Sequence, residues 1–340
     1  MKSNYSIEEL NFNEDSELEQ KRTRKIFEDL RIKAKKGIEL LEREKDFLCF
    51  GLELSKIETD EKVNQCKVCE NYIFKNLFLI YYSKAYGDKI MKVKGTSLYE
   101  VNLAEKRKDE HFLNKRASEW LNIVRKTNHS NKMLKAISKE TRKDLKILEK
   151  ENPPIKLLTK KKRKAFRDKK TRLLLLSKYV YLTAKKILEN EKNINLTINF
   201  SNNKIEFDEF SLIHILYGHY AQIIKEDANK TYHYEEFKPD ILPSKLNEIL
   251  TEIGKTNYYN EIPEQIYFEY KDITYAVWIK EETKQIKGKG NIQYYHLKTF
   301  YPLELENDLN KVKETHSLKE ISNEIKLYVK NKAYNILYSQ

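Results

Sequence analysis

Two histidines lie close together in the segment Phe210–Lys225, whose sequence is FSLIHILYGHYAQIIK. At 100° per residue, a helix places four residues of this segment on one stripe: His214, Gly218, Ala221 and Lys225. The stripe combines an imidazole, a cation and a gap of small residues, the layout expected where a phosphate or a ribose approaches a helix. His219 lies about 140° around the helix from His214. We interpret it either as a second acid–base group or as a hydrogen-bonded core histidine.

A second set of reactive groups lies in Asn291–Pro302, which is predicted to be a strand. With alternating faces, one side carries Tyr295, Thr299 and Tyr301, and the other carries His296, Lys298 and Phe300. We expect the hydroxyl groups of Thr299 and Tyr301, in preference to His296, to join the helix histidines in a site.

Together these residue types suit cleavage of RNA by its own 2′-hydroxyl group. The attack needs a base for the 2′ proton, an acid for the departing 5′ oxygen, and cations for the phosphoryl oxygens. Histidine can serve as base or acid near neutral pH. The cations must come from lysine, because no arginine follows Arg172. The predicted substrate-binding lysines are Lys225, Lys238, Lys287, Lys289 and Lys298.

Three short motifs follow one another in this half of the chain: H-I-x-x-G-H at 214–219, K-P-x-x-x-P at 238–243 and K-T-F-Y-P at 298–302. Over Ile194–Leu303, about a third of the chain, the order of elements and motifs resembles the barnase–EndoU–colicin–RelE-like nuclease superfamily, particularly its phage- and toxin-associated branches. The resemblance implies a metal-independent endoribonuclease with His214, His219 and Thr299 in its active site. It also leaves room for a tRNA or ribosome-associated target and for an inhibitory partner protein.

Two other functions stay open. Asp240, Glu269 and Lys271 are spaced like the P-D…[D/E]-x-K pattern of magnesium-dependent nucleases, in which the acids bind metal and the lysine supports the attacking water. Such short patterns arise by chance in a chain with 34% charged residues. The other alternative is a non-catalytic protein that binds nucleic acid or a partner. Cleavage in EDTA, cleavage that requires Mg²⁺, and binding without cleavage distinguish the three functions.

The positive charge of the chain is concentrated in one region. The formal net charge is +13, and residues 105–186 contain 27 Lys and Arg against 9 Asp and Glu. The peak is Lys156–Arg172, KLLTKKKRKAFRDKKTR, a density that attracts a polyanion such as the phosphate backbone of RNA. The alternative is a solvated basic loop or helix face. The predicted backbone contacts are Lys160, Lys161, Lys162, Arg163, Lys164 and Arg167.

The predicted fold class is α+β, a large helical region followed by a small antiparallel-sheet domain with packed helices. Helical periodicity covers residues 16–56, 61–86, 105–151 and 172–188. Alternating and β-rich runs predict strands at 194–200, 204–207, 265–270, 274–280 and 291–302, with helices at 209–227 and 243–254. The expected domains are 1–189, helical and basic in its second half, 190–305, nuclease-like, and 306–340, containing a final helix at 317–338.

Composition excludes several other classes. The 8 glycines form neither a G-x-G-x-x-G nor a G-x-x-x-x-G-K-[S/T] loop, so no nucleotide cofactor is expected. Cys66 and Cys69 have the spacing of half a zinc site, and the other half is missing, so no metal is expected. Neither an apolar signal segment nor an apolar run of about 18 residues is present. We therefore expect a cytoplasmic protein that makes no membrane contact and uses no cofactor.

Overall fold

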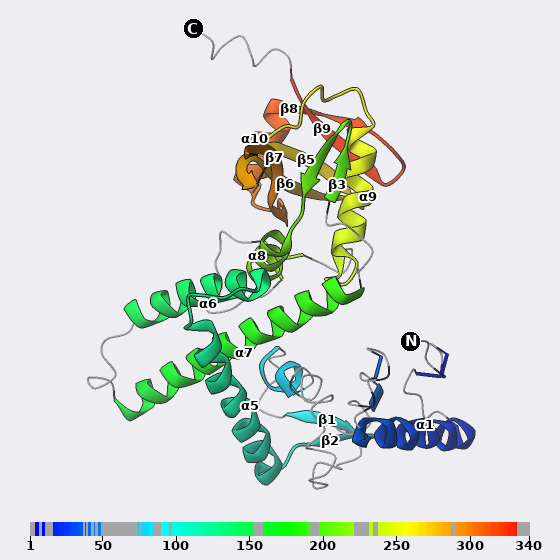
Figure 1. The fold of residues 1–340 in the computed structure, drawn as a ribbon, viewed down its shortest axis with the longest axis vertical. Coiled ribbons are helices and arrows are strands. Elements are labelled where there is room, and N and C mark those ends of the chain that lie inside the picture. Colours follow the sequence, from blue (N-terminus) through cyan, green and yellow to red (C-terminus); the bar gives the residue numbers. More distant parts are fainter. Residues whose placement is uncertain are drawn as a thin grey trace. The chain divides into compact units, whose positions relative to one another are not determined.

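The computed structural model describes residues 4–6, 9–10, 16–36, 38, 40–41, 44, 47–48, 74, 77–83, 90–94, 97–151, 159–190, 197–220, 231–233, 237–286, 288 and 290–331. The chain divides into two compact units, Met1–Trp120 and Leu121–Gln340 (Figure 1). This boundary lies well before the predicted one near residue 190. The reason is that the helices between residues 132 and 190 pack with the sheet-bearing part of the chain.

The first unit contains a long helix and a β-hairpin. Helix α1, Glu17–Lys35, begins after Ser16, whose hydroxyl accepts a hydrogen bond from the Glu19 N–H. The helical periodicity predicted over 16–56 does not form one helix, because α1 ends at Lys35 and the described residues Glu44, Phe47 and Leu48 are helical again. The unit also contains the π-helix η2 at Leu79–Ser83 and the antiparallel strands β1 at Met91–Lys94 and β2 at Ser97–Glu100. The cysteine pair at 66 and 69 lies outside the described residues.

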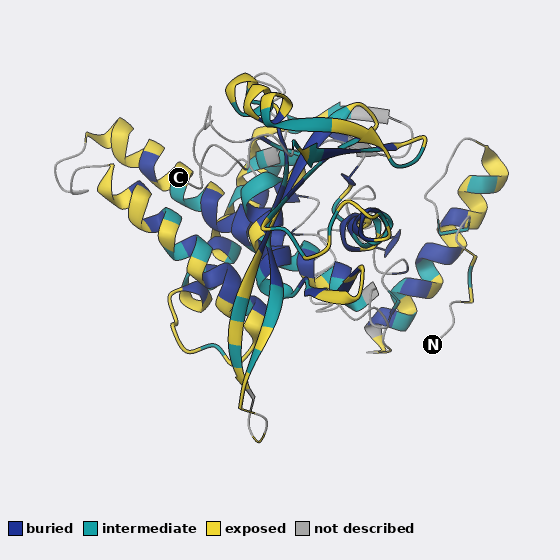
Figure 2. Ribbon diagram, turned by 90° about the horizontal axis from the view of Figure 1, so that it is seen from above, coloured by how far each residue is buried: buried dark blue, intermediate teal, exposed yellow. Residues whose placement is uncertain are grey.

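Helix α5, Leu103–Val124, leads into the second unit, which opens with the helices α6, Lys132–Lys150, and α7, Lys160–Asn190. The helix pair predicted over 105–151 is confirmed. Helices α6 and α7 lie side by side (Figure 1), and a buried hydrogen bond joins the hydroxyl groups of Thr141 and Ser177. Toward their connection, both helices turn exposed faces to solvent (Figure 2).

A seven-stranded sheet forms the centre of the second unit, in the order β3-β4-β7-β6-β5-β9-β8. The fold class α+β is confirmed, but the sheet is mixed because β4 pairs parallel with β7. The other neighbouring strands pair antiparallel. The strands are β3 at Thr197–Phe200, β4 at Asn203–Glu206, β5 at Gln265–Tyr270, β6 at Ile273–Ile286, β7 at Gly290–Pro302, β8 at His316–Glu320 and β9 at Ile325–Lys330.

An irregularity in β7 changes which side chains share a face. Trp278 pairs with Thr299 across the strands, whereas the next residue, Ile279, pairs with Leu297. Lys298 is therefore an extra residue, as in a β-bulge. Cross-strand partners share a face, so His296, opposite Lys280, lies on the same face as Thr299. The sequence-based prediction placed Tyr295 on the same face as Thr299, and His296 on the other face. This assignment is wrong because the bulge interrupts the alternation of side chains.

Both faces of the sheet are covered. One face carries fully buried aromatic side chains, among them Phe268, Tyr275 and Phe300, and the last two contact Phe237. Helix α9, Leu242–Gly254, packs against β3, where a Cβ at Gly254 would lie 2.6 Å from the backbone nitrogen of Ser201. The opposite face holds a smaller cluster beneath α10, Glu306–Thr315, composed of Ala276, Leu303, Val312 and Tyr328. Among the helices described, none has both the length and the apolar composition needed to cross a bilayer.

The predicted C-terminal helix is wrong beyond Thr315. After α10 the chain forms the hairpin β8–β9, and β9 pairs with β5 inside the sheet. Ile325, Leu327 and Tyr328 are buried there, as in a strand whose two faces are both covered. Residues 332–340 lie outside the described part.

Candidate active site

Helix α8, Glu209–His219, carries both predicted histidines and packs against β7, α6 and α7. It begins at Asp208, whose Oδ1 accepts hydrogen bonds from the N–H groups of Phe210 and Ser211 at 3.0 and 3.1 Å. Most of its side chains are apolar and buried, and the two histidines are its groups that can exchange a proton near neutral pH. The helix was predicted to reach residue 227. Ala221 and Lys225, the far half of the predicted stripe, lie outside the described residues.

His219 is held so that one ring nitrogen can accept a proton. Its Nδ1 lies 3.1 Å from the carbonyl oxygen of Thr231. A carbonyl only accepts, so Nδ1 carries the proton and Nε2 of the neutral ring presents its lone pair. This Nε2 lies 3.2 Å from the Thr299 hydroxyl, and the imidazole stacks on the Tyr301 ring with centroids 5.0 Å apart. The structure thus brings together three of the four predicted catalytic residues.

His214, the fourth, lies on the next turn with a different partner. Its ring centroid is 6.5 Å from that of His219. The Nδ1 atom lies 3.3 Å from Oε1 of Glu140 on α6, which was not predicted. The hydrogen bond with His214 lowers the pKa of the Glu140 carboxyl, although burial opposes the shift. Because Nδ1 is engaged by the carboxylate, Nε2 is the atom through which His214 exchanges a proton with a ligand.

A pocket of about 390 Å³ lies beside His214, between α6, α8 and β7. His214, Glu140 and Lys139 line one side, and His296 and Lys298 line the other. Lys298 is a predicted substrate-binding residue, whereas Lys139 was not predicted. The pocket therefore has two ammonium groups beside His214, the cations and one of the acid–base groups that phosphoryl transfer requires. His219 is not among its lining residues, and its ring centroid lies 6.5 Å from that of His214.

His296 lies at the centre of a network of charged groups. Its Nε2 is 3.0 Å from Oδ1 of Asp208, and its Nδ1 is 3.1 Å from Oε2 of Glu282 and 2.9 Å from Nζ of Lys298. Burial alone would raise the pKa of the Asp208 carboxyl, but hydrogen bonds from His296 and Ser211 outweigh it and lower the pKa. The pKa of Glu282 is lowered in the same way, chiefly by Lys298. These contacts hold the wall of the pocket and tie β7 to the start of α8.

Replacing Asp208 with alanine is therefore expected to reduce the free energy of unfolding by about 2–4 kcal/mol, through loss of the helix cap and of the bond to His296. Asp208→Asn keeps the capping oxygen and should lose about half as much. Urea unfolding at neutral pH measures both. Equal stability of the wild type and the alanine variant would contradict this role.

The stabilisation that Asp208 provides through its bond to His296 is expected to depend on pH. The folded-state pKa of Asp208 lies below its ordinary value of 3.8, so its contribution is present above that pH and is lost as the pH falls through the lower folded value. The difference in stability between the wild type and Asp208→Ala should therefore shrink below about pH 4.

The other predicted lysines are not brought to this pocket. Lys238 is exposed in the turn before α9 and lines neither pocket described here. Lys287 and Lys289 lie outside the described residues.

The residues of the magnesium pattern are dispersed among other contacts. Glu269 pairs with Lys326 on β9, and Lys271 lies at a φ of 49° in the β5–β6 turn, over the Tyr270 ring. Asp240 is exposed before α9. Within the described part of the chain, no three His, Cys, Asp or Glu side chains form a group that could hold a metal ion.

From Lys160 to Arg172, the basic segment forms the first turns of α7, and residues 156–158 lie outside the described part. The helix begins beside Thr159, whose hydroxyl accepts a hydrogen bond from the Lys162 N–H, and Phe166 anchors it against Leu148 of α6. Six predicted backbone-binding residues are exposed on it: Lys160, Lys161, Lys162, Arg163, Lys164 and Arg167. Lysines at a helix start add to the positive end of the helix dipole, so this surface is strongly cationic.

No model of a protein family, no curated protein and no solved structure matches this chain. The resemblance to the nuclease superfamily therefore stays a prediction, and the function has to be inferred from the residues of the site.

Proposed function

We propose that this protein is a ribonuclease that cleaves RNA without a metal ion, by attack of a ribose 2′-hydroxyl on the adjacent phosphodiester. The observation that carries the proposal is the pair His214 and His219, whose rings lie 6.5 Å apart with their Nδ1 atoms engaged by Glu140 and by a backbone carbonyl. An acid and a base, each oriented through its second nitrogen, are what this reaction needs.

The two histidines have different roles in the proposed reaction. His219 Nε2 removes the 2′ proton, in the position where Thr299 now donates its hydroxyl. The 2′ oxygen bonds to phosphorus, the bond from phosphorus to the 5′ oxygen breaks, and His214 Nε2 gives a proton to the departing oxygen. The products are a 2′,3′-cyclic phosphate and a 5′-hydroxyl. Lys298 and Lys139 stabilise the charge on the phosphoryl oxygens.

Tyr301 supports the base through its ring. Burial raises the pKa of the Tyr301 hydroxyl, so the group remains a neutral phenol at physiological pH. Its hydroxyl accepts a hydrogen bond from the Trp278 indole at 3.2 Å while its ring stacks on His219. Tyr301 is in this proposal a positioning residue that keeps Nε2 of His219 directed at the attacking hydroxyl.

The proposal is tested with single-stranded RNA and DNA of the same sequence, in EDTA and in Mg²⁺. We expect RNA to be cleaved in both solutions and DNA in neither, because DNA lacks the 2′-hydroxyl. Cleavage that requires Mg²⁺ would favour the alternative based on Asp240, Glu269 and Lys271. Binding without cleavage of either polymer would favour a non-catalytic protein.

The cationic start of α7 is proposed to bind the RNA backbone without regard to sequence. Replacing Lys160, Lys161, Lys162 and Lys169 by glutamine should weaken binding to all single-stranded RNAs about equally. If each lysine contacts a phosphate, the slope of log K against log salt should fall by about 3. Fluorescence anisotropy at several salt concentrations measures the change.

The matched control replaces four exposed lysines elsewhere in the same unit: Lys204, Lys255, Lys313 and Lys319. It removes the same charge and should change the salt slope little. Equal slopes for the two quadruple variants would place the RNA backbone on another surface.

A further inference from the structure

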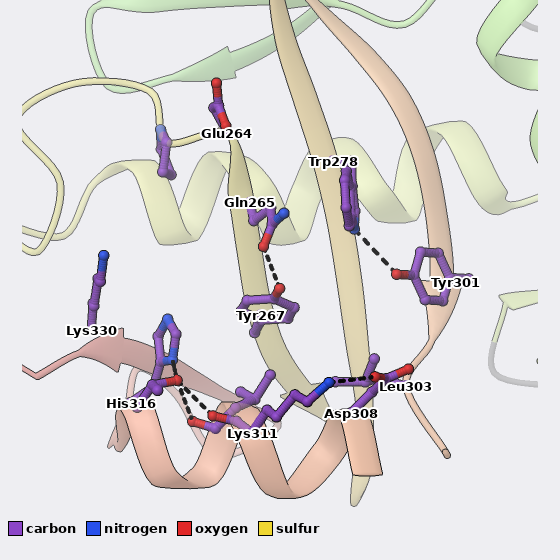
Figure 3. Close-up of a pocket in the computed structure, with 13 residues that line it drawn as sticks. Glu264, Gln265, Tyr267, Trp278, Tyr301, Leu303, Asp308, Lys311, His316 and Lys330 are labelled. Atoms are coloured by element: carbon purple, nitrogen blue, oxygen red, sulfur yellow. Dashed lines mark hydrogen bonds and ion pairs between the residues drawn. The ribbon is translucent and has the colours of Figure 1, made fainter. Parts of the chain in front are cut away.

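A second and larger pocket, of about 680 Å³, lies on the other side of Tyr301, between the sheet and α10. Figure 3 shows its aromatic wall, formed by Tyr267, Trp278 and Tyr301 from three neighbouring strands. Gln265 lies beside them, and Lys311 and Lys330 come from α10 and β9 on the opposite side. The volume is that of a small-molecule site, and its lining mixes flat rings with a few polar groups.

Trp278 is the unusual member of this wall. Its indole N–H is already bonded to Tyr301, yet 41% of the residue remains exposed. A tryptophan offers a large apolar surface that folding normally buries. One that keeps much of this surface in a pocket has room to stack against a planar ligand. Gln265 accepts a hydrogen bond from Tyr267 through its amide oxygen, and in Figure 3 its nitrogen lies on the side of Trp278.

The pocket adjoins the catalytic residues through Tyr301, which lines it. Trp278 pairs with Thr299 across β6 and β7, and Ala276 pairs with Tyr301 two residues along. Thr299 and Tyr301 of β7 both contact His219. A ligand stacked on Trp278 would therefore lie one side chain away from the group that removes the 2′ proton.

We infer that this pocket receives a base of the RNA substrate, next to the phosphate that is cleaved. The choice of a nucleobase as occupant rests on the proposed function. The chemistry of the wall agrees with it, because aromatic rings stack on any base and the Gln265 amide can hydrogen-bond to a base edge. Of the cations in the lining, Lys311 is paired with Asp308 at 3.9 Å, and Lys330 lies on β9. The pocket thus places one nucleotide and sets the cleavage position.

Tryptophan fluorescence tests this inference without relying on cleavage. The chain has 2 tryptophans, and Trp120 is only 3% exposed, so Trp120→Phe leaves Trp278 as the reporter. The probe is a 2′-O-methyl RNA hexamer, which this chemistry cannot cleave, and the control is a hexamer with the same backbone and no bases. We expect saturable quenching by the first and none by the second, because only a base can stack on the indole.

A binding measurement in the otherwise unaltered chain covers the case in which Trp120→Phe does not fold. Trp278→Ala should weaken binding of the 2′-O-methyl hexamer about 5- to 150-fold and leave binding of the abasic backbone unchanged. Tyr258→Ala is the matched control, because Tyr258 is an aromatic residue of similar exposure, 44%, that does not line the pocket.

The outcomes separate this inference from the proposed function. RNA cleavage by the wild type, together with equal binding of the hexamer by the wild type and Trp278→Ala, overturns the inference and leaves the proposed function standing. Base-dependent quenching in a protein that cleaves no RNA supports the pocket and overturns the proposed cleavage. Quenching by the abasic backbone overturns stacking on Trp278.

Discussion

Replacing His219 with alanine is expected to slow RNA cleavage by at least about a hundredfold, the smaller end of what a general acid or base contributes. The reason is that Nε2 of His219 is the atom positioned to accept the 2′ proton, with its tautomer fixed by the Thr231 carbonyl. The free energy of unfolding should fall by only about 1–2 kcal/mol, the cost of leaving one partner of a hydrogen bond unsatisfied. Single-turnover cleavage in EDTA and urea unfolding measure the two effects.

Two controls separate proton transfer from structure. Imidazole added to the His219→Ala protein should restore part of the activity, which it cannot do if the ring only packs against Tyr301. His129→Ala removes a histidine that contacts Ser138 in the same unit, away from the pocket, and should cleave at the wild-type rate. A stable His219→Ala protein with full activity would rule out His219 as the base.

Replacing His214 with alanine should produce a loss of the same size, because it removes the proton donor for the departing 5′ oxygen. Glu140→Gln should produce a smaller loss, about ten- to a hundredfold, corresponding to one charge-assisted hydrogen bond. Glu140 acts through His214, at 3.3 Å, and contacts no substrate atom in the proposed reaction. It is a positioning residue.

A double-mutant cycle tests this dependence. If Glu140 acts through the imidazole, Glu140→Gln should have almost no further effect in the His214→Ala protein. Equal effects in both backgrounds would show that the carboxylate acts on its own. Glu140→Asp keeps the negative charge on a shorter side chain. If this variant cleaves RNA faster than Glu140→Gln, and only when His214 is present, the positioning role is supported.

The elements that carry the site were largely predictable, because they depend on local sequence. The periodicity of residues 105–151 indicates α5 and α6, and the capping pattern from Asp208 to Ser211 marks the start of α8. The alternation in Thr197–Phe200 and in Gly290–Pro302 indicates strands. His214, His219, Thr299 and Tyr301 could be selected because reactive side chains are unusual inside such apolar segments.

The partners of these residues could not be selected, because they come from distant parts of the chain. Glu140 is 74 residues from His214, and Asp208 is 88 residues from His296. Glu140 lies in a helix with many charged residues, and nothing in its neighbourhood distinguishes it from the others. Only the packing of α6 against α8 gives it a role.

His296 was set aside for a different reason. Strict alternation along β7 would place the side chains of His296 and Thr299 on different faces of the sheet. The bulge at Lys298 brings both side chains to one face. A bulge of this kind has no signal in the segment Tyr294–Pro302, which contains no glycine. The helix expected at 317–338 is wrong because β9 pairs with β5 and β8 pairs with β9, and this pairing is supplied by tertiary structure.

The most direct test of the proposed reaction is the chemical identity of the new 3′ end. A short RNA is incubated in EDTA with the wild type and with the His214→Ala/His219→Ala double variant, and the products are analysed by mass spectrometry. The proposed chemistry predicts a 2′,3′-cyclic phosphate with the wild type and no product with the double variant. A free 3′-hydroxyl, or the same product from both proteins, would contradict it.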